Sequence, residues 1–240
     1  MYKGICVVIL FICFYKSKAQ NSPAYSDAGH WTTLSVDYSI NKKWSIIAAE
    51  EIRFRENYSR LNILFTNIGL EFNANKYVKS ALVYRFINKL DDDNSFTFRH
   101  RLMWDIIAKY KYIRWSFLYR HRLQGEYRSY FTDEFGKLPE IYSRSKIEIG
   151  YNINKKWSTY LSAEMRYQIH DYKRIVSEDN WHRIRVQAGI DYKLNKYSKI
   201  GTYYLIQKAF NVANLENIYI TGLEYSMSLK DSPLFKKKKK

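Results

Sequence analysis

The sequence predicts an all-β fold, a single antiparallel transmembrane β-barrel of about ten to twelve strands. Three observations support this prediction. Apolar and polar residues alternate along most of the chain, which is the period of a strand with two unlike faces. A strand–turn–strand phrase recurs in distant parts of the sequence, and an export signal stands before it. No segment keeps the apolar period of a helix over several turns, so strands are expected to be the main element.

Residues 1–19 are expected to be a signal peptide. Lys3 is followed by an apolar stretch over 4–15, and the small residues Ser17 and Ala19 occupy the positions that a signal peptidase reads. This stretch is shorter than the roughly 20 residues that a transmembrane helix needs. We therefore expect cleavage after Ala19, with an uncleaved anchor as the alternative.

Both cysteines, Cys6 and Cys13, lie inside this segment. Bulky Ile12 stands where a small residue is required before a lipidated cysteine, so lipidation is not expected. The mature chain then has no thiol, which excludes a disulfide framework and a cysteine-based metal site.

Residues 20–230 are expected to form one barrel domain, followed by a basic tail at 231–240. The chain has only three prolines and nine glycines, and no Pro/Ser/Gly-rich linker interrupts it. Aromatic residues make up 18% of the chain, with 23 tyrosines. Aromatic belts at two bilayer interfaces would account for this composition, with outer-membrane lipid as the surrounding medium.

The chain has a formal net charge of +17, and the positions of the basic residues decide which partners this charge suggests. A basic balance in general points to nucleic acid or anionic surfaces. Here the arginines recur at strand period, and an exported protein rarely meets nucleic acid, so no nucleic-acid binding is expected. The run Lys236–Lys240 is interpreted as a solvated tail, with binding to anionic headgroups or cell-wall polymers as the alternative.

One phrase, Ile-Asn-Lys-Lys-Trp-Ser, occurs at 40–45 and again at 153–158. A second, Gly-Leu-Glu-Phe and then Asn-Lys-Tyr, spans 69–77 and returns with conservative changes at 189–197. In each copy a polar Asn-Lys turn joins two alternating segments, which is typical of a β-meander.

Short turns and longer polar connections alternate along the chain. The short turns are expected at 41–43, 73–76, 109–111, 154–156 and 193–196, and the longer connections near 56–60, 88–95, 125–140, 169–180 and 209–216. This alternation is typical of an outer-membrane barrel with periplasmic turns and extracellular loops.

The strand count leaves one question open. Four matching phrases end strands that run toward the short-turn side, which would make the first and last strands run in the same direction. That requires an odd number of strands, whereas bacterial barrels usually have an even number. Either one strand is missed, or residues 20–30 cross the membrane inside or beside the barrel.

The segments 44–54, 96–106 and 113–124 each have one apolar and one charged face. The apolar face is expected to meet lipid and the charged face to line the interior, with a soluble barrel as the alternative. The candidate lumen-lining residues are Glu51, Arg53, Arg55, Arg99, Arg101, Asp105, Arg120, Arg122, Arg144, Glu148, Glu164, Arg166, Arg183 and Arg185.

Arg-x-Arg pairs dominate these candidates and allow two functions. They could form a positive constriction that selects an anionic solute, because rings of arginine favour anions. They could equally form a salt-bridged plug in which Glu51, Asp105, Glu148 and Glu164 neutralise the arginines. The sequence therefore predicts a non-enzymatic barrel, either a narrow anion-preferring pore or a structural barrel with a salt-bridged lumen.

No motif for catalysis, metal or cofactor is present, so none is expected. A lipid-modifying hydrolase of the outer membrane remains an alternative, because His100, His121 and His182 share the apolar face near the long-loop rim. Such an enzyme needs a serine beside the histidine, and the alternation places none there.

A third possibility is a surface interaction protein acting through loop 125–140, whose Tyr127, Tyr130, Phe131 and Phe135 are unusually apolar for a solvated connection. The last strand, with Gly222, Tyr225 and Met227 at regular spacing, looks like a signal for the barrel-assembly machinery.

Several of these features together resemble a known family. They are Trp31, the Asn-Lys turns, Glu51-x-Arg53-Phe54, the run at 98–102 and the closing segment at 217–225. The family is catalogued as domain of unknown function 2490, in exported bacterial proteins expected to be outer-membrane β-barrels. The likeness covers roughly 28–229. It implies the fold and the location, and it implies no activity.

Overall fold

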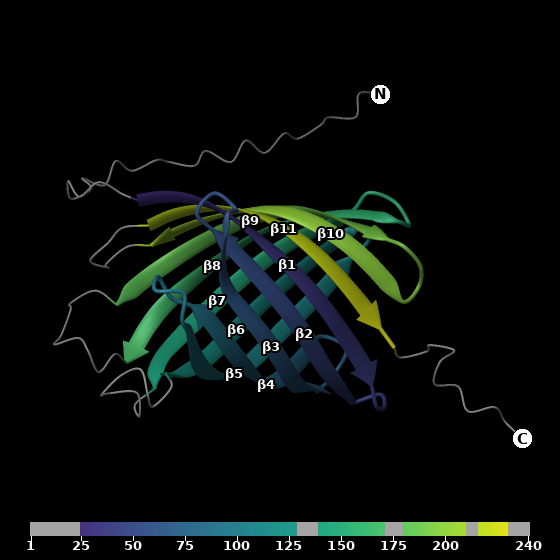
Figure 1. Cartoon of the computed structure of the whole chain (residues 1–240). Helices are drawn as coiled ribbons and strands as arrows, with labels where there is room; N and C mark the ends of the chain where they lie inside the picture. The colour runs from purple at the N-terminus through teal and green to yellow at the C-terminus, as the bar shows by residue number, and fades with distance from the viewer. Residues whose placement is uncertain (1–24, 129–138, 171–179, 210–215, 230–240) are drawn as a thin grey trace, which may run out of the picture.

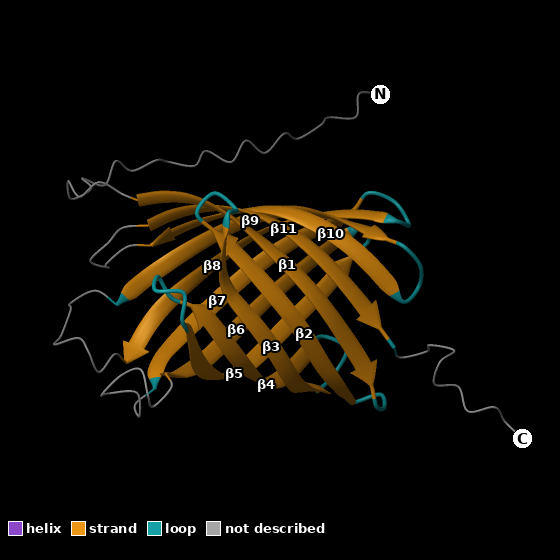
Figure 2. Cartoon of the chain, viewed as in Figure 1, coloured by secondary structure: helices purple, strands orange, loops and turns teal. Residues whose placement is uncertain are grey.

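The computed structural model describes residues 25–128, 139–170, 180–209 and 216–229. The expected signal peptide and the lysine tail lie outside these residues, as do Tyr130, Phe131 and Phe135 of the 125–140 loop. The described chain forms a closed barrel of eleven strands (Figures 1 and 2). No helix in this part of the chain has the length and apolarity needed to cross a membrane.

The strands follow one another around the barrel in chain order. They are β1 (Tyr25–Ser39), β2 (Trp44–Arg55), β3 (Arg60–Asn73), β4 (Val78–Leu90), β5 (Phe96–Tyr112), β6 (Trp115–Arg128), β7 (Glu140–Asn152), β8 (Trp157–His170), β9 (Trp181–Lys193), β10 (Ser198–Ala209) and β11 (Glu216–Ser228).

Every consecutive pair is antiparallel, and the barrel closes through β1 and β11, which run parallel from Tyr25↔Glu216 to Asp37↔Ser228. A meander with an odd number of strands must close in this way. The same-direction first and last strands expected from the sequence are therefore real. Residues 25–30 belong to the wall itself, neither inside nor beside the barrel.

The Asn-Lys phrases form their turns through the asparagine side chain. In each one the amide oxygen accepts hydrogen bonds from two backbone N–H groups, at 2.8–2.9 Å. This is the geometry by which asparagine stabilises a tight turn. The asparagines are Asn41, Asn75, Asn154 and Asn195. The repeated phrase is thus a repeated turn, and we call this side of the barrel the short-turn end.

The remaining short turn differs from the sequence prediction. β5 continues to Tyr112, which pairs with Trp115, so the turn consists of Ile113 and Arg114 and not of residues 109–111. Ile113 adopts a φ of 53°. A left-handed conformation is costly for a β-branched residue, whereas asparagine tolerates it in two-residue hairpin turns.

Replacing Ile113 by asparagine is therefore expected to stabilise the folded barrel by about 1 kcal/mol. The measurement is the urea midpoint of the refolded protein, read by heat-modifiable gel migration. Ile153→Asn is the matched control, because Ile153 lies in a short turn without a positive φ. Equal midpoints for the two variants would contradict the strain at Ile113.

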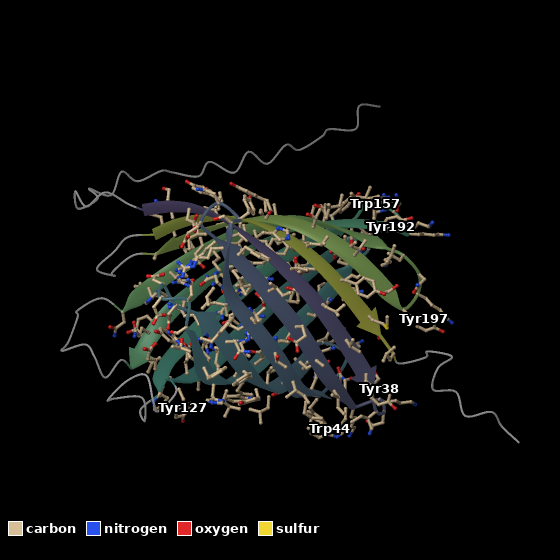
Figure 3. All side chains as sticks on the ribbon, in the orientation of Figure 1. Tyr38, Trp44, Tyr127, Trp157, Tyr192 and Tyr197 are labelled. Atoms are coloured by element: carbon tan, nitrogen blue, oxygen red, sulfur yellow. The ribbon has the colours of Figure 1, made fainter. Side chains whose placement is uncertain are left out.

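The outer surface is mostly apolar, and most of the buried charged side chains face the interior. On β5, Trp104 and Ile106 are 50% and 40% exposed, while Asp105 between them is 4% exposed. Aromatic pairs sit next to the short turns, including Trp44–Phe72, Trp115–Tyr151 and Trp157–Tyr192 at 4.6–4.9 Å between centroids. Figure 3 shows Trp44, Trp157, Tyr192 and Tyr197 together at this end, with Tyr127 at the opposite, long-loop end. These faces are those expected of a barrel in lipid and the reverse of a soluble barrel.

Candidate functional site in the barrel lumen

Along each strand, more exposed side chains alternate with less exposed ones. All the candidate lumen-lining residues are at the less exposed positions. Eight arginines and four carboxylates make up most of the charge there, and we call them the arginine–carboxylate network. Its members are Arg53, Arg85, Arg99, Arg101, Arg120, Arg122, Arg144, Arg185, Glu51, Asp105, Glu126 and Glu164. The side chains of the four carboxylates are only 5–11% exposed.

Glu164 on β8 is the centre of the network. Its Oε2 accepts a hydrogen bond from Arg120 of β6 at 2.6 Å. Its Oε1 accepts from Nε of Arg144 on β7 at 3.2 Å and from Arg185 of β9 at 3.3 Å. One carboxylate therefore connects four neighbouring strands and is shared by three guanidinium groups.

Two further carboxylates occupy the β5–β6 side. Glu126 accepts hydrogen bonds from Arg99 at 3.3 Å and from Nε of Arg101 at 3.0 Å. Asp105 receives two parallel hydrogen bonds from Arg122, at 2.6 and 2.7 Å. The Arg122–Asp105 pair has the bidentate geometry that makes arginine–carboxylate pairs strong and directional.

The fourth carboxylate, Glu51, lies 2.5 Å from Arg53 of the same strand and 3.7 Å from Arg85 of β4. Trp31 of β1 joins this group to the Glu164 group. Its ring lies 3.5 Å from the guanidinium carbon of Arg53 and 5.3 Å from that of Arg185, which comes from β9. Cation–π contacts of this kind fix guanidinium groups without a counter-charge.

Sequence reasoning missed Arg85, Glu126 and the lumenal role of Trp31. In the middle of the inward face of β4, Arg85 is surrounded by apolar Ala81, Val83 and Ile87, so no Arg-x-Arg pair marked this strand. Inward Ala81 and Val83 pack with Met103, and a second apolar cluster joins Tyr203, Leu205 and Ile220. The lumen is therefore filled by apolar side chains as well as by ion pairs.

The other candidates lie outside the network. Arg55 pairs with Asp92 beyond the long-loop end of β4, at 2.5 Å, and Glu148 pairs with Lys146 at 2.8 Å. Arg183 donates to Gln207 at 3.4 Å.

His182 does not point outward as the alternation suggested. A register shift at Arg166 brings Nδ1 of His182 to 2.7 Å from Arg166, whose guanidinium group also covers the Tyr142 ring at 4.3 Å. An irregularity of one residue reverses the direction of a strand side chain. Of the three histidines that were expected on the apolar face near the long-loop rim, His100 and His121 therefore remain candidates for a hydrolase.

Two cavities inside the barrel are lined by described residues. The central cavity, of about 170 Å³, is lined by Trp31, Arg120, Arg144, Glu164, Arg185 and Glu224 among others. The short-turn cavity, of about 630 Å³, is lined by residues such as Ser35, Asp37, Ala49, Lys199 and Ser226. The members of the arginine–carboxylate network thus gather around the smaller space, and none of them lines the larger one.

On the outer face the structure corrects the expectation that no serine accompanies the histidines. His121 faces Ser145 across β6 and β7, with Nδ1 3.2 Å from the Ser145 hydroxyl, which is also 3.4 Å from the Tyr119 hydroxyl. In the part of the chain that the structure describes, no carboxylate contacts His121. A hydrolytic site needs an orienting group and donors for an oxyanion, and strand amides are already engaged in the sheet.

The described residues contain no group of three or more histidine, cysteine or acidic side chains that could hold a metal ion. The arrangement inside the barrel can pair charges, bind anions and exclude water, and these are the chemical capacities on which a function can be built.

The chain is similar in structure to a known porin and in sequence to a known protein family. A solved structure described as the NanC porin in a rhombohedral crystal form is similar to this chain, with a TM-score of 0.48 and 12% identity. That match covers 75% of this chain and 85% of the other. A search of curated proteins gave no match. A family model matches residues 28–218, and the chain belongs to that family, described as Protein of unknown function (DUF2490).

Proposed function

We propose that this protein is a non-enzymatic outer-membrane β-barrel whose lumen is held closed by the arginine–carboxylate network. The single observation that carries the proposal is that four carboxylates, each at most 11% exposed, cross-link eight arginines inside the barrel. Charged groups packed in this way can close the middle of a small barrel, between the two cavities.

The location in a membrane is supported by the outer face. A continuous apolar surface with aromatic pairs beside the short turns matches the girdled belt of outer-membrane barrels. The apolar side chains of such a face would be costly to leave in water.

A narrow anion-preferring pore is the second candidate, and the charge balance favours it. Because it holds eight arginines and four carboxylates, the network itself is positive even after pairing. A positive constriction lowers the barrier for anions and raises it for cations. Slight rearrangement of the network would then let small anions pass.

Electrical recording separates the two candidates. The mature protein is refolded, its folding is checked by heat-modifiable migration, and currents are recorded in a planar bilayer under a salt gradient. A closed barrel is expected to be folded but electrically silent. Discrete current steps with a reversal potential of anionic sign would refute the closed lumen and support the pore.

If current steps occur, Arg99→Ser with Arg101→Ser is expected to reduce the anion preference, because it removes two lumenal charges. Lys42→Ser with Lys43→Ser is the matched control, since both lysines are exposed in a short turn. A conducting double variant with unchanged reversal potential would rule out these arginines as the selective element.

A further inference from the structure

We propose that the central cavity is a binding site for one small oxyanion, such as inorganic phosphate or the carboxylate of a small organic acid. This inference goes beyond the closed barrel, because binding at an internal site requires no conductance. It rests on a charge imbalance, on the size of the cavity and on the donors that line it.

The imbalance lies at Glu164. Arg120, Arg144 and Arg185 all contact this one carboxylate, and both of its oxygens are occupied. The remaining hydrogen-bond partners of Arg144 and Arg185 are the neutral amide oxygens of Gln124 and Gln207, at 3.1 and 2.8 Å. Three guanidinium groups therefore share a single negative charge.

These guanidinium groups are mostly withdrawn from solvent. The side chains of Arg120, Arg144 and Arg185 are 23%, 10% and 15% exposed. All three line the central cavity, so part of this residual exposure faces it. A buried positive charge without a partner is costly, and an anion in the cavity would offset that cost.

The cavity has the volume for such an anion. At about 170 Å³ it would hold roughly five or six waters at the volume that water occupies in the liquid. A tetrahedral oxyanion or a short carboxylic acid fits this space, whereas a sugar phosphate or a nucleotide is too large.

Neutral donors also reach the cavity. Ser162 and Tyr203 line it and are 4% and 7% exposed, and neither hydroxyl is hydrogen-bonded to another described side chain. Hydroxyl groups can donate to an oxyanion oxygen that the guanidinium groups leave open. Together the arginines and hydroxyls offer charge-assisted and neutral hydrogen bonds from several directions.

A second carboxylate besides Glu164 lines this site, and it provides a test of the sign of the effect. Glu224 lines the same cavity, and no hydrogen bond or ion pair joins it to Arg120, Arg144 or Arg185 among the described residues. Its negative charge would repel a bound anion. Neutralising Glu224 should therefore tighten binding, whereas neutralising Arg185 should weaken it.

Calorimetric titration of the refolded, detergent-solubilised protein tests the proposal. Phosphate, sulfate, acetate and succinate are each added at matched ionic strength, with chloride as the background. Saturable binding of one anion per chain is expected, together with a rise in the thermal midpoint. Tighter binding of phosphate identifies an inorganic ligand, and tighter binding of acetate or succinate identifies an organic acid.

Variants make the test specific to the cavity. Arg185→Gln is expected to weaken binding by about tenfold or more, the value of one charge-assisted hydrogen bond. Glu224→Gln is expected to strengthen it by about threefold, and Lys42→Gln in the exposed turn to leave it unchanged. If Arg185→Gln does not fold, the direction in which Glu224→Gln changes the anion affinity still decides whether the proposal holds.

Absence of saturable binding to the wild-type protein would overturn the proposal, and so would weaker or equal binding by Glu224→Gln. These outcomes are independent of the recordings proposed above. A silent barrel without anion binding refutes only this site, and a conducting barrel with anion binding refutes only the closed lumen.

Discussion

Replacing Glu164 by glutamine is expected to destabilise the folded barrel by about 3–5 kcal/mol, the cost of removing one partner from a buried ion pair. The substitution keeps the shape of the side chain and removes its charge. Arg120, Arg144 and Arg185 would then face one another with no carboxylate between them. Their mutual repulsion adds to the cost of burying them.

The effect is measured as the loss of urea midpoint in refolded protein, followed by heat-modifiable migration. Glu148→Gln is the matched control, because in the described part of the chain Glu148 forms an ion pair only with Lys146 and its side chain is 25% exposed. That control is expected to cost less than about 1 kcal/mol, as for a partly exposed pair. Similar losses for both variants would mean that Glu164 is not the centre of the network.

Valine in place of Gly222 is the second substitution with a large expected effect. A Cβ atom at this position would collide with the ring of Tyr203, which rests on the glycine across β10 and β11. The ring cannot stay where it is, and its displacement disturbs the cluster with Leu205 and Ile220. Overpacking of this kind costs about 3 kcal/mol or more when the neighbour is a rigid ring.

Gly125→Val is the matched control, since among the described residues a Cβ there meets only Pro139 at 3.7 Å, an ordinary contact. We expect Gly125→Val to fold with an unchanged urea midpoint, and Gly222→Val to fold poorly or not at all. Adding Tyr203→Ala to Gly222→Val should restore part of the lost stability. An equal tolerance of valine at both glycines would contradict the close ring–backbone contact.

Much of this architecture follows from local sequence alone. The alternation along segments such as 44–54 places Glu51 and Arg53 on one face and Ile46 and Ile52 on the other. The Asn-Lys phrases fix short turns because an asparagine side chain can replace the missing backbone partners. Even the odd strand count was implied, since matching phrases marked the first and last strands as running in the same direction.

Other features could not be derived from spacing. Arg85 was missed because its neighbours Ala81, Val83 and Ile87 on the same face of β4 are apolar. His182 was misplaced because a register shift turns it toward Arg166. The Ser145 hydroxyl lies beside His121 only because β6 and β7 pair in one particular register. The expected signal peptide and the lysine tail stay predictions.

The sequence by itself determined the alternation along most strands and the turns that the Asn-Lys phrases form, because these depend on neighbours within a few residues. Only the tertiary structure decided which charges meet. Glu164 gathers arginines from β6, β7 and β9, and Trp31 lies against Arg185 from β9. Such encounters depend on the register and tilt summed around all eleven strands, which no single segment of the chain encodes.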